Sequence, residues 1–192
     1  HDKKSEELFV KEGFGLYRKE LMYNDYVLVG NKNDSLKLKG IKNIKKSFKK
    51  IYDAKINFVS RADNSGTYKK ELSIWKNLGL KINPKKDFWY LETGSGMGPS
   101  LNIAVNKNAA ILTDRATWIS FSNKRNHTIL VERDKDLYNY YGIIPISQKK
   151  CPKSKIEISE KFINWLLSNK GQELINLFRK NGEQLFFSSA IN

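Results

Sequence analysis

The chain is poor in the residues that build disulfides, metal clusters and proton-transfer sites. Of its 192 residues one is cysteine, Cys151, and two are histidines, His1 and His127. A single cysteine excludes an internal disulfide and a cysteine-ligated metal cluster. Neither histidine lies in a catalytic motif. No pair of carboxylates and no activated nucleophile occurs at a spacing typical of a catalytic site. The sequence therefore predicts no enzyme, no metal site and no cofactor.

Long apolar runs and arginine are also scarce. No hydrophobic stretch approaches the roughly 20 residues that span a bilayer, and the first residues are charged, so no signal peptide is expected in the chain. Because His1 is not an initiator methionine, we expect a chain processed from a longer precursor. Six arginines stand against 29 lysines, with a net charge of +15. Arginine reads phosphates and guanines bidentately and lysine does not, so we interpret the charge as a solvated surface and expect no nucleic-acid partner. A nucleic-acid-binding module stays open as a minor alternative.

Short apolar segments alternate with amphipathic helical patterns along the chain. Strands are predicted at residues 26–30, 56–60, 109–113, 129–131 and 141–146. Helices are predicted at residues 3–12, 68–78, after Pro99, and over 158–180, the last one divided at Gly171 and ended by Gly182. Alternation of strands with helices predicts an α/β fold with mostly parallel strand pairing.

The most informative stretch is FVSRADNSGTYKKELSIWKNL, residues 58–78. A short apolar strand leads into a polar turn, and apolar residues then recur at helical spacing. The first N–H groups of such a helix have no intrahelical partner, so this turn predicts an anion site. Glu71, one turn into the helix, is expected at the surface. The expected anion ligands are Arg61, Ser65, Gly66 and Thr67.

A second polar turn, followed by another helix, comes after the apolar residues 88–91. Three glycines at alternate positions free its backbone, and Pro99 suits the first turn of a helix. We expect Gly96 to have a positive φ or to pack its backbone against the ligand. The glycine spacing fits neither a dinucleotide fingerprint nor a phosphate loop. The expected site residues here are Thr93, Gly94, Ser95, Gly96, Met97 and Gly98.

For each of these positions a purely structural role remains open from the residues alone. Arg61 can pair with a nearby carboxylate such as Asp63, which is the commonest fate of an arginine. Ser65 can be an ordinary N-cap, and the glycines can serve only a tight turn. A local ion pair is the simplest reading of Asp114 and Arg115.

Taken together, the motifs resemble the tungstate-binding proteins of bacterial ABC importers, which are class II periplasmic solute-binding proteins. The resemblance covers nearly the whole chain in the same order, and the two polar turns are its most specific part. It rests on MYNDYVLVG at 22–30, FVSRADNSGTYKKE at 58–71, WYLETGSGMGPSLNIA at 89–104, AILTDRATW at 110–118, YGIIPI at 141–146 and FINWLLSNKGQELINLF at 162–178.

The resemblance implies a two-lobed α/β fold, with two crossing strands and an oxyanion in the cleft. Residues 1–30 would supply part of lobe 1 and the first crossing strand, and residues 31–140 lobe 2. Residues 141–192 would supply the second crossing strand and the C-terminal helices of lobe 1. Members of the family open with a threonine- and serine-rich strand-to-helix turn that this sequence lacks. We therefore expect the N-terminal part of lobe 1 to be a missing segment of the same protein upstream of His1.

The resemblance also implies a function. It points to an extracytoplasmic solute-binding protein that captures a tetrahedral oxyanion, tungstate or molybdate, and delivers it to the membrane permease of an ABC importer. The expected location is periplasmic, or extracellular and membrane-anchored, after signal-peptide removal. Arg61, Ser65, Gly66 and Thr67 match the family's anion-holding motif, residues 93–98 match a second loop, and Arg115 matches a nearby basic position. The alternative is the ligand-sensing domain of a transcription regulator with the same fold.

Overall fold

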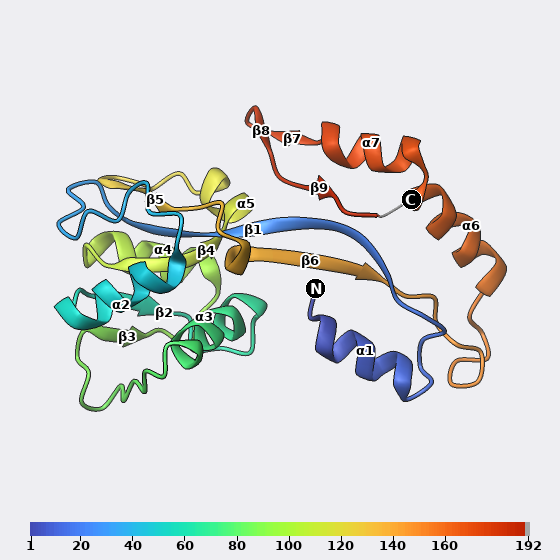
Figure 1. Cartoon of the computed structure of the whole chain (residues 1–192), viewed down its shortest axis with the longest axis horizontal. Helices are drawn as coiled ribbons and strands as arrows, with labels where there is room; N and C mark the ends of the chain where they lie inside the picture. The colour runs from blue at the N-terminus through green and yellow to red at the C-terminus, as the bar shows by residue number, and fades with distance from the viewer. Residues whose placement is uncertain (191–192) are drawn as a thin grey trace. The chain divides into compact units, whose positions relative to one another are not determined.

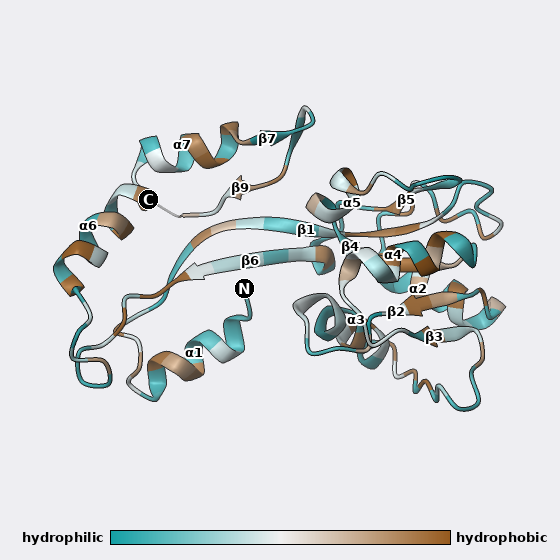
Figure 2. Cartoon of the chain, turned by 180° about the vertical axis from the view of Figure 1, so that it is seen from behind, coloured by the Kyte–Doolittle hydropathy of each residue, from teal (hydrophilic) through white to brown (hydrophobic). Residues whose placement is uncertain are grey.

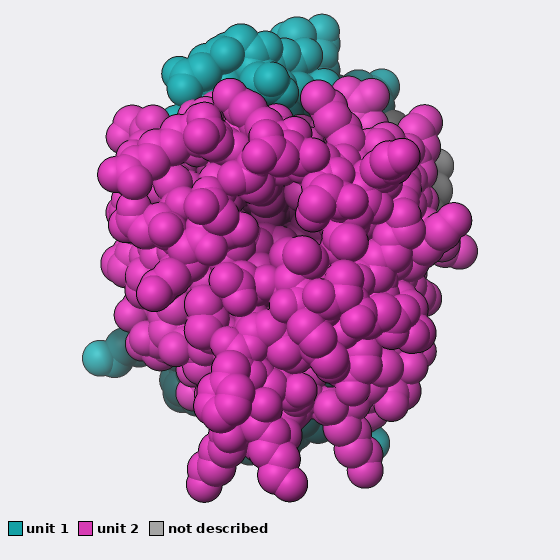
Figure 3. All heavy atoms as spheres, turned by 90° about the vertical axis from the view of Figure 1, so that its left-hand side faces the viewer, with its two compact units in different colours: residues 1–24, 139–192 teal, residues 25–138 magenta. Residues whose placement is uncertain are grey.

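A computed structural model describes residues 1–190 (Figure 1). Residues 191 and 192, the end of the predicted C-terminal part of lobe 1, lie outside the described residues. The chain forms two compact units, which Figure 3 shows in different colours. Unit 1 comprises residues 1–24 and the chain after residue 138, and unit 2 comprises residues 25–138. The lobe boundaries at residues 30/31 and 140/141 stay a prediction.

Unit 2 is built on a mixed sheet with the strand order β3-β2-β4-β1-β5. Strand β2 is parallel to both β3 and β4, whereas β1 is antiparallel to β4 and β5. The predicted mostly parallel pairing is therefore wrong. Strand β1 comes from unit 1 and enters the sheet against the direction of the three parallel strands. The strands are β1 (Lys19–Asn31), β2 (Phe58–Ser60), β3 (Tyr90–Glu92), β4 (Ala110–Asp114) and β5 (His127–Val131).

Successive residues of these strands point to opposite faces of the sheet, so that helices cover both sides. On one face Leu28 and Phe58 pack with α2 (Ile44–Ala54) and α3 (Gly66–Asn77). On the other face Val27, Val59 and Ile111 pack with α4 (Met97–Asn106) and α5 (Arg115–Ser120). Strand β2 is coloured hydrophobic in Figure 2, as expected for a strand buried on both faces. The predicted α/β class is confirmed.

Unit 1 contains the N-terminal helix α1 (Lys3–Lys11), the first part of β1 and the C-terminal elements. Strand β9 pairs antiparallel with β1, joining Met22 to Ser188 and Tyr23 to Phe187. A short 3-10 helix, η1 (Lys135–Leu137), precedes β6 at the end of unit 2. The remaining elements are β6 (Tyr138–Ile143), α6 (Ile156–Leu167), α7 (Asn169–Leu177), β7 (Arg179–Lys180), β8 (Glu183–Gln184) and β9 (Phe187–Ser188).

The C-terminal helical segment divides at Ser168, not at Gly171 as predicted. The Ser168 hydroxyl accepts a hydrogen bond from the Gly171 N–H at 3.3 Å and so caps α7. Gly171 lies in the first turn of α7, where a Cβ would stand 2.4 Å from the carbonyl oxygen of Trp165. Glycine therefore serves close packing there. Helix α7 ends at Leu177, ahead of Gly182, which instead has a φ of +79° in the β7–β8 turn. Within residues 1–190, no helix has the length and apolarity that a membrane crossing requires.

Candidate anion site

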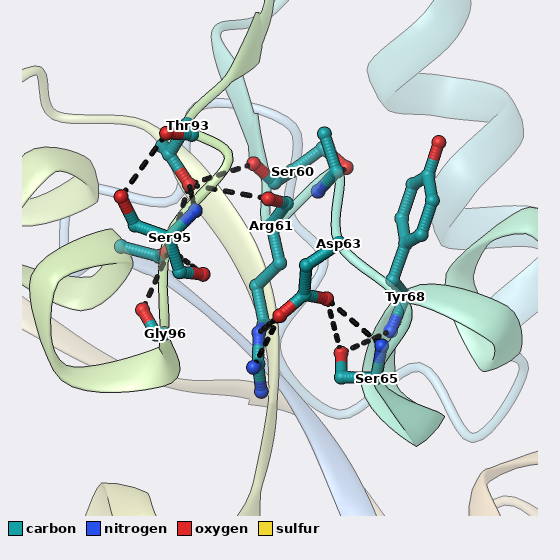
Figure 4. A network of polar contacts seen from close by, with 10 residues as sticks. Ser60, Arg61, Asp63, Ser65, Tyr68, Thr93, Ser95 and Gly96 are labelled. Atoms are coloured by element: carbon teal, nitrogen blue, oxygen red, sulfur yellow. Dashed lines mark hydrogen bonds and ion pairs between the residues drawn. The ribbon is translucent and has the colours of Figure 1, made fainter.

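The two predicted anion loops start at the same edge of the unit 2 sheet. Ser60, the last residue of β2, is the in-register parallel neighbour of Glu92, the last residue of β3. Thr93 then ties the loops together, since its N–H donates to the Ser60 carbonyl at 3.0 Å. Its Oγ1 donates to the same carbonyl at 3.2 Å (Figure 4). The structure thus brings residues 61–65 and 93–96 side by side.

In the first loop Arg61 is held by Asp63. Nε and Nη2 of Arg61 both donate to Asp63 Oδ2, the first at 3.0 Å (Figure 4). Asp63 Oδ1 accepts from the Ser65 N–H at 3.1 Å and from the Ser65 hydroxyl at 2.5 Å. Burial opposes ionisation of Asp63, but the hydrogen bonds from Ser65 and Arg61 win and lower its pKa. Arg61 and Asp63 therefore form an ion pair, which fixes the guanidinium beside the loop of residues 61–65.

Helix α3 begins directly after this loop. Ser65 is its N-cap, and the Ser65 hydroxyl accepts a hydrogen bond from the Tyr68 N–H at 3.2 Å. Because that hydroxyl also donates to Asp63, it already has partners on both sides. Gly66 and Thr67 form the first turn, where helix geometry gives their N–H groups no acceptor four residues back. The backbone of Gly66 and Thr67 is thus better placed than the Ser65 side chain to meet an anion.

Helix α4 begins after the second loop without a side-chain cap. Its N-cap is Gly96, with φ −63° and ψ 169°, so the predicted positive φ at Gly96 is wrong. An N-cap requires this extended conformation, and the turn is made by Gly94 instead, with φ +59°. A Cβ added at Gly94, Gly96 or Gly98 would meet nothing within 4 Å. The glycines therefore leave open space over the start of α4, where helix geometry gives the N–H groups of Met97 and Gly98 no intrahelical acceptor.

The hydroxyl groups of the second loop bond mostly to the loop itself. Thr93 Oγ1 and Ser100 Oγ lie 2.8 Å apart, and Ser100 is fully buried. The Ser95 hydroxyl donates to the Thr93 carbonyl at 3.0 Å (Figure 4). Ser100 also donates to the Gly96 carbonyl at 2.9 Å. Thr93 and Ser95 thus shape the loop. The sequence reading missed Ser100 and the bridging role of Asp63, although a D-x-S pattern before a helix is a signal for such a turn.

Arg115 is occupied elsewhere. It opens α5, and its Nε and Nη2 donate to the two carboxylate oxygens of Asp25 at 2.7 and 2.6 Å. Nη2 also donates to Glu132 at 2.7 Å. Asp114 instead caps α5, where it accepts hydrogen bonds from the N–H and the hydroxyl of Thr117 at 2.8 and 2.6 Å. Among the described residues no hydrogen bond links Arg115 to either anion loop.

Glu71 is buried, with 2 % of its surface exposed, so its predicted surface position is wrong. Glu71 lies on the same face of α3 as Tyr68 and Trp75, and this face packs against β3. Its carboxylate is satisfied there by the hydroxyl of Tyr90 and the indole N–H of Trp75. A carboxylate within an apolar helical face is a signal that the sequence does carry.

Comparison with known proteins identifies relatives over nearly the full chain. The profile of the PBP superfamily domain matches residues 1–170. The tungstate-binding protein TupA of Peptoclostridium acidaminophilum is 42% identical over 194 residues, which cover 99% of this chain and 67% of the relative. The solved tungstate-binding protein TupA from Desulfovibrio alaskensis G20 matches with a TM-score of 0.92 and 39% identity, covering 100% of this chain and 77% of that one. The tungstate ABC transporter structure from Geobacter sulfurreducens matches with a TM-score of 0.78 and 37% identity, over 93% and 75% of the two chains.

Proposed function

The chain belongs to the PBP superfamily, in the family of the tungstate-binding proteins, and on that premise we propose that it captures tungstate or molybdate for import by an ABC transporter. The relatives named above are binding and transport proteins, which supports capture of a solute over catalysis. Because the relatives named above bear the names of binding and transport proteins, they support the sensing-domain alternative less than capture for import. The oxyanion is the transported ligand and not a cofactor.

One observation carries this proposal. The N-terminal ends of α3 and α4 follow two neighbouring parallel strands, and therefore stand at one edge of the sheet. Each helix start presents N–H groups without intrahelical acceptors and the positive end of a helix dipole. Two such ends beside one arginine make a site for a small anion with several oxygens.

Different atoms of the site have different tasks in this proposal. Arg61 supplies a full positive charge and a planar fork that matches two oxygens. Asp63 keeps the guanidinium oriented, at the cost of part of its attraction for an anion. The N–H groups of Gly66, Thr67 and Gly98 supply directed, uncharged donors. A tetrahedral oxyanion has enough oxygens to use all of them at once.

We propose further that the partner is the membrane permease of an ABC importer and that the protein works outside the cytoplasm. Both statements follow the character of the relatives, one of which is a tungstate ABC transporter. The lysine-rich surface agrees with a freely solvated carrier, because scattered lysines keep a protein soluble without forming an arginine-lined nucleic-acid groove.

Isothermal titration with tungstate, molybdate, sulfate and phosphate at one pH tests the proposal. We expect saturable binding of one tungstate per chain, with molybdate close behind, and binding of sulfate and phosphate at least 100-fold weaker, which corresponds to about 3 kcal/mol. Absence of tungstate binding, or equal affinity for all four anions, would contradict the proposed function.

A further inference from the structure

A cavity of about 250 Å³ lies in unit 2, between the segment that leads into α2 and the chain at the end of β5. This volume is many times the space that one water molecule needs. Three of the residues that line the cavity are cationic and three are apolar, namely Lys39, Lys42, Arg133, Ile41, Ile129 and Leu130. The cavity therefore combines positive charge with apolar surface, and none of its residues belongs to the anion loops.

The cations of the cavity have no carboxylate partner in the protein. Lys39, Lys42 and Arg133 are exposed, and within residues 1–190 their side chains form no ion pair and no hydrogen bond. Glu132 also lines the cavity, but its carboxylate accepts a hydrogen bond from Arg115 at 2.7 Å. The cavity wall thus carries positive charge that the protein leaves uncompensated and that an anion would neutralise.

Two aspartates fix the backbone of the segments that form the cavity. Asp34 accepts hydrogen bonds from the N–H groups of Leu38 and Lys39 at 2.7 and 2.8 Å. Asp134 is buried and accepts the N–H of Ile44 at 2.6 Å, which ties the start of α2 to the chain after β5. A cavity held in this way is ordered before a ligand arrives, and this lowers the entropic cost of binding.

The cavity adjoins a basic segment. Residues 35–52 contain seven lysines and no aspartate or glutamate. Two of these lysines line the cavity, and Lys37 and Lys46 are exposed as well. The apolar residues of α2 are buried in the core, so that its lysines lie on the side that faces solvent. The positive charge around the cavity is therefore part of a wider basic surface.

An anionic phospholipid surface fits this combination of features. It presents many phosphate groups in one plane, and it attracts lysines through their charge without requiring the planar fork of arginine. One phosphate group can enter the cavity, where Ile41 and Ile129 offer apolar surface to the glycerol carbons of the lipid. A nucleic acid fits less well, because Arg133 is the one arginine among the cations of the cavity.

From these observations we propose that the cavity and residues 35–52 form a docking surface for an anionic membrane, with one phospholipid phosphate bound among Lys39, Lys42 and Arg133. The inference goes beyond the capture of tungstate and does not depend on it. Contacts of this kind are electrostatic and screened by salt, so docking is reversible and the carrier stays soluble between encounters. Tungstate and the membrane do not compete, because they use different residues.

The first test is flotation of the protein with vesicles of phosphatidylcholine alone and of equal parts phosphatidylcholine and phosphatidylglycerol. The cavity variant is Lys39→Gln/Lys42→Gln/Arg133→Gln. The control, Lys85→Gln/Lys86→Gln/Lys107→Gln, removes the same charge from three other exposed lysines of unit 2. Urea unfolding shows whether both variants keep the stability of the parent.

We expect the parent to bind the vesicles with phosphatidylglycerol and not those without it. The cavity variant should bind on the order of 100-fold more weakly, and the control within about 3-fold of the parent, because only charges close to the lipid surface contribute. No binding by the parent, or an equal loss of binding in both variants, overturns the docking surface.

The second test separates a membrane from soluble anions. Glycerol 3-phosphate and a polyglutamate peptide are titrated into the parent, and the amide signals of Lys42 and Arg133 are followed by NMR. We expect glycerol 3-phosphate to shift these signals with an affinity roughly 100-fold below that for the vesicles, because a single phosphate lacks the contacts with the neighbouring lysines. Equal affinity for glycerol 3-phosphate or for the peptide overturns the membrane as the ligand. Loss of vesicle binding in saturating tungstate would place tungstate in this cavity and overturns the inference as well.

Discussion

Arg115 and Asp25 are joined by a two-pronged ion pair, in which Nε and Nη2 donate to the two carboxylate oxygens at 2.7 and 2.6 Å. Asp25 is 4 % exposed and lies on β1, while Arg115 opens α5. The pair therefore joins β1, at the residue where this strand enters unit 2, to the helix that follows β4. The hydrogen bonds that Arg115 donates to Asp25 are the main reason why the pKa of Arg115 is raised, so its guanidinium stays charged.

We predict that Arg115→Gln lowers the free energy of unfolding by roughly 3 kcal/mol, because it leaves a buried carboxylate without its cation. Urea unfolding measures this, with Arg125→Gln as the control, since Arg125 is exposed and its guanidinium donates a hydrogen bond to Asn106 and not to a carboxylate. The family resemblance places Arg115 near the anion. A variant that loses tungstate affinity at unchanged stability would support that assignment and contradict a structural role.

Arg61→Lys should weaken tungstate binding 10- to 100-fold, because lysine keeps the charge but loses the planar fork that matches two oxygens. Arg61→Ala should weaken it more. Stability should change by less than about 1 kcal/mol, since the ion pair with Asp63 is short-range and partly exposed. Isothermal titration with tungstate gives the affinities, with Arg125→Lys as the matched control. If both Arg61 variants bind tungstate with the affinity of the parent, Arg61 takes no part in anion binding and only pairs with Asp63.

Gly96→Ser should weaken tungstate binding while leaving the fold intact or slightly more stable. A serine at this N-cap has room for its Cβ. Because Pro99 has no N–H, the serine hydroxyl would accept a hydrogen bond from the N–H of Gly98, which we assign to the anion. The expected gain in stability is a few tenths of a kcal/mol, roughly. Lys155, the N-cap of α6, likewise has no side-chain cap bond, so Lys155→Ser is the control. If both variants bind tungstate like the parent, the start of α4 takes no part in binding.

The stability of the protein should fall as the pH rises from about 4.5 to about 7 through the contribution of Glu71. Over this window the unfolded carboxyl group ionises while the buried one, whose pKa is raised to about 7, stays protonated. Glu71→Gln lacks this contribution. Its free energy of unfolding relative to the parent should therefore increase by roughly 3 kcal/mol between pH 4.5 and pH 8, which follows from about 1.4 kcal/mol per pKa unit. Urea unfolding at both pH values measures it, and a constant difference would contradict a raised pKa.

Much of the fold was predictable from local patterns. The turn between β2 and α3 was found because apolar strand residues, a run of small polar residues and a helical apolar stripe follow one another within residues 58–78. Strand direction was not predictable in the same way. The antiparallel direction of β1 depends on its long-range pairing with β4 and β5, and the residues of β1 itself do not indicate this pairing.

The site was predictable in its position more than in its hydrogen bonds. Glycine spacing indicated an open helix start, yet which glycine makes the turn was decided by the N-cap geometry of Gly96 and the positive φ of Gly94. The burial of Glu71 depends on Tyr90, a residue on a neighbouring strand. Gly171 looked like a helix breaker and is instead a close-packing residue beside Trp165. The last two outcomes were set by packing between different elements, which local sequence patterns do not show.

We propose that an oxyanion binds where β2 and β3 end, between the starts of α3 and α4. Anomalous diffraction at a tungsten absorption edge, from crystals of the protein grown with tungstate, tests it most directly, because the signal locates the metal atom itself. We expect one strong peak, at a position where the oxygens of the anion lie within hydrogen-bond distance of the Arg61 guanidinium and of the first N–H groups of both helices. A peak elsewhere in the protein, or contacts to only lysines on the surface, would contradict it.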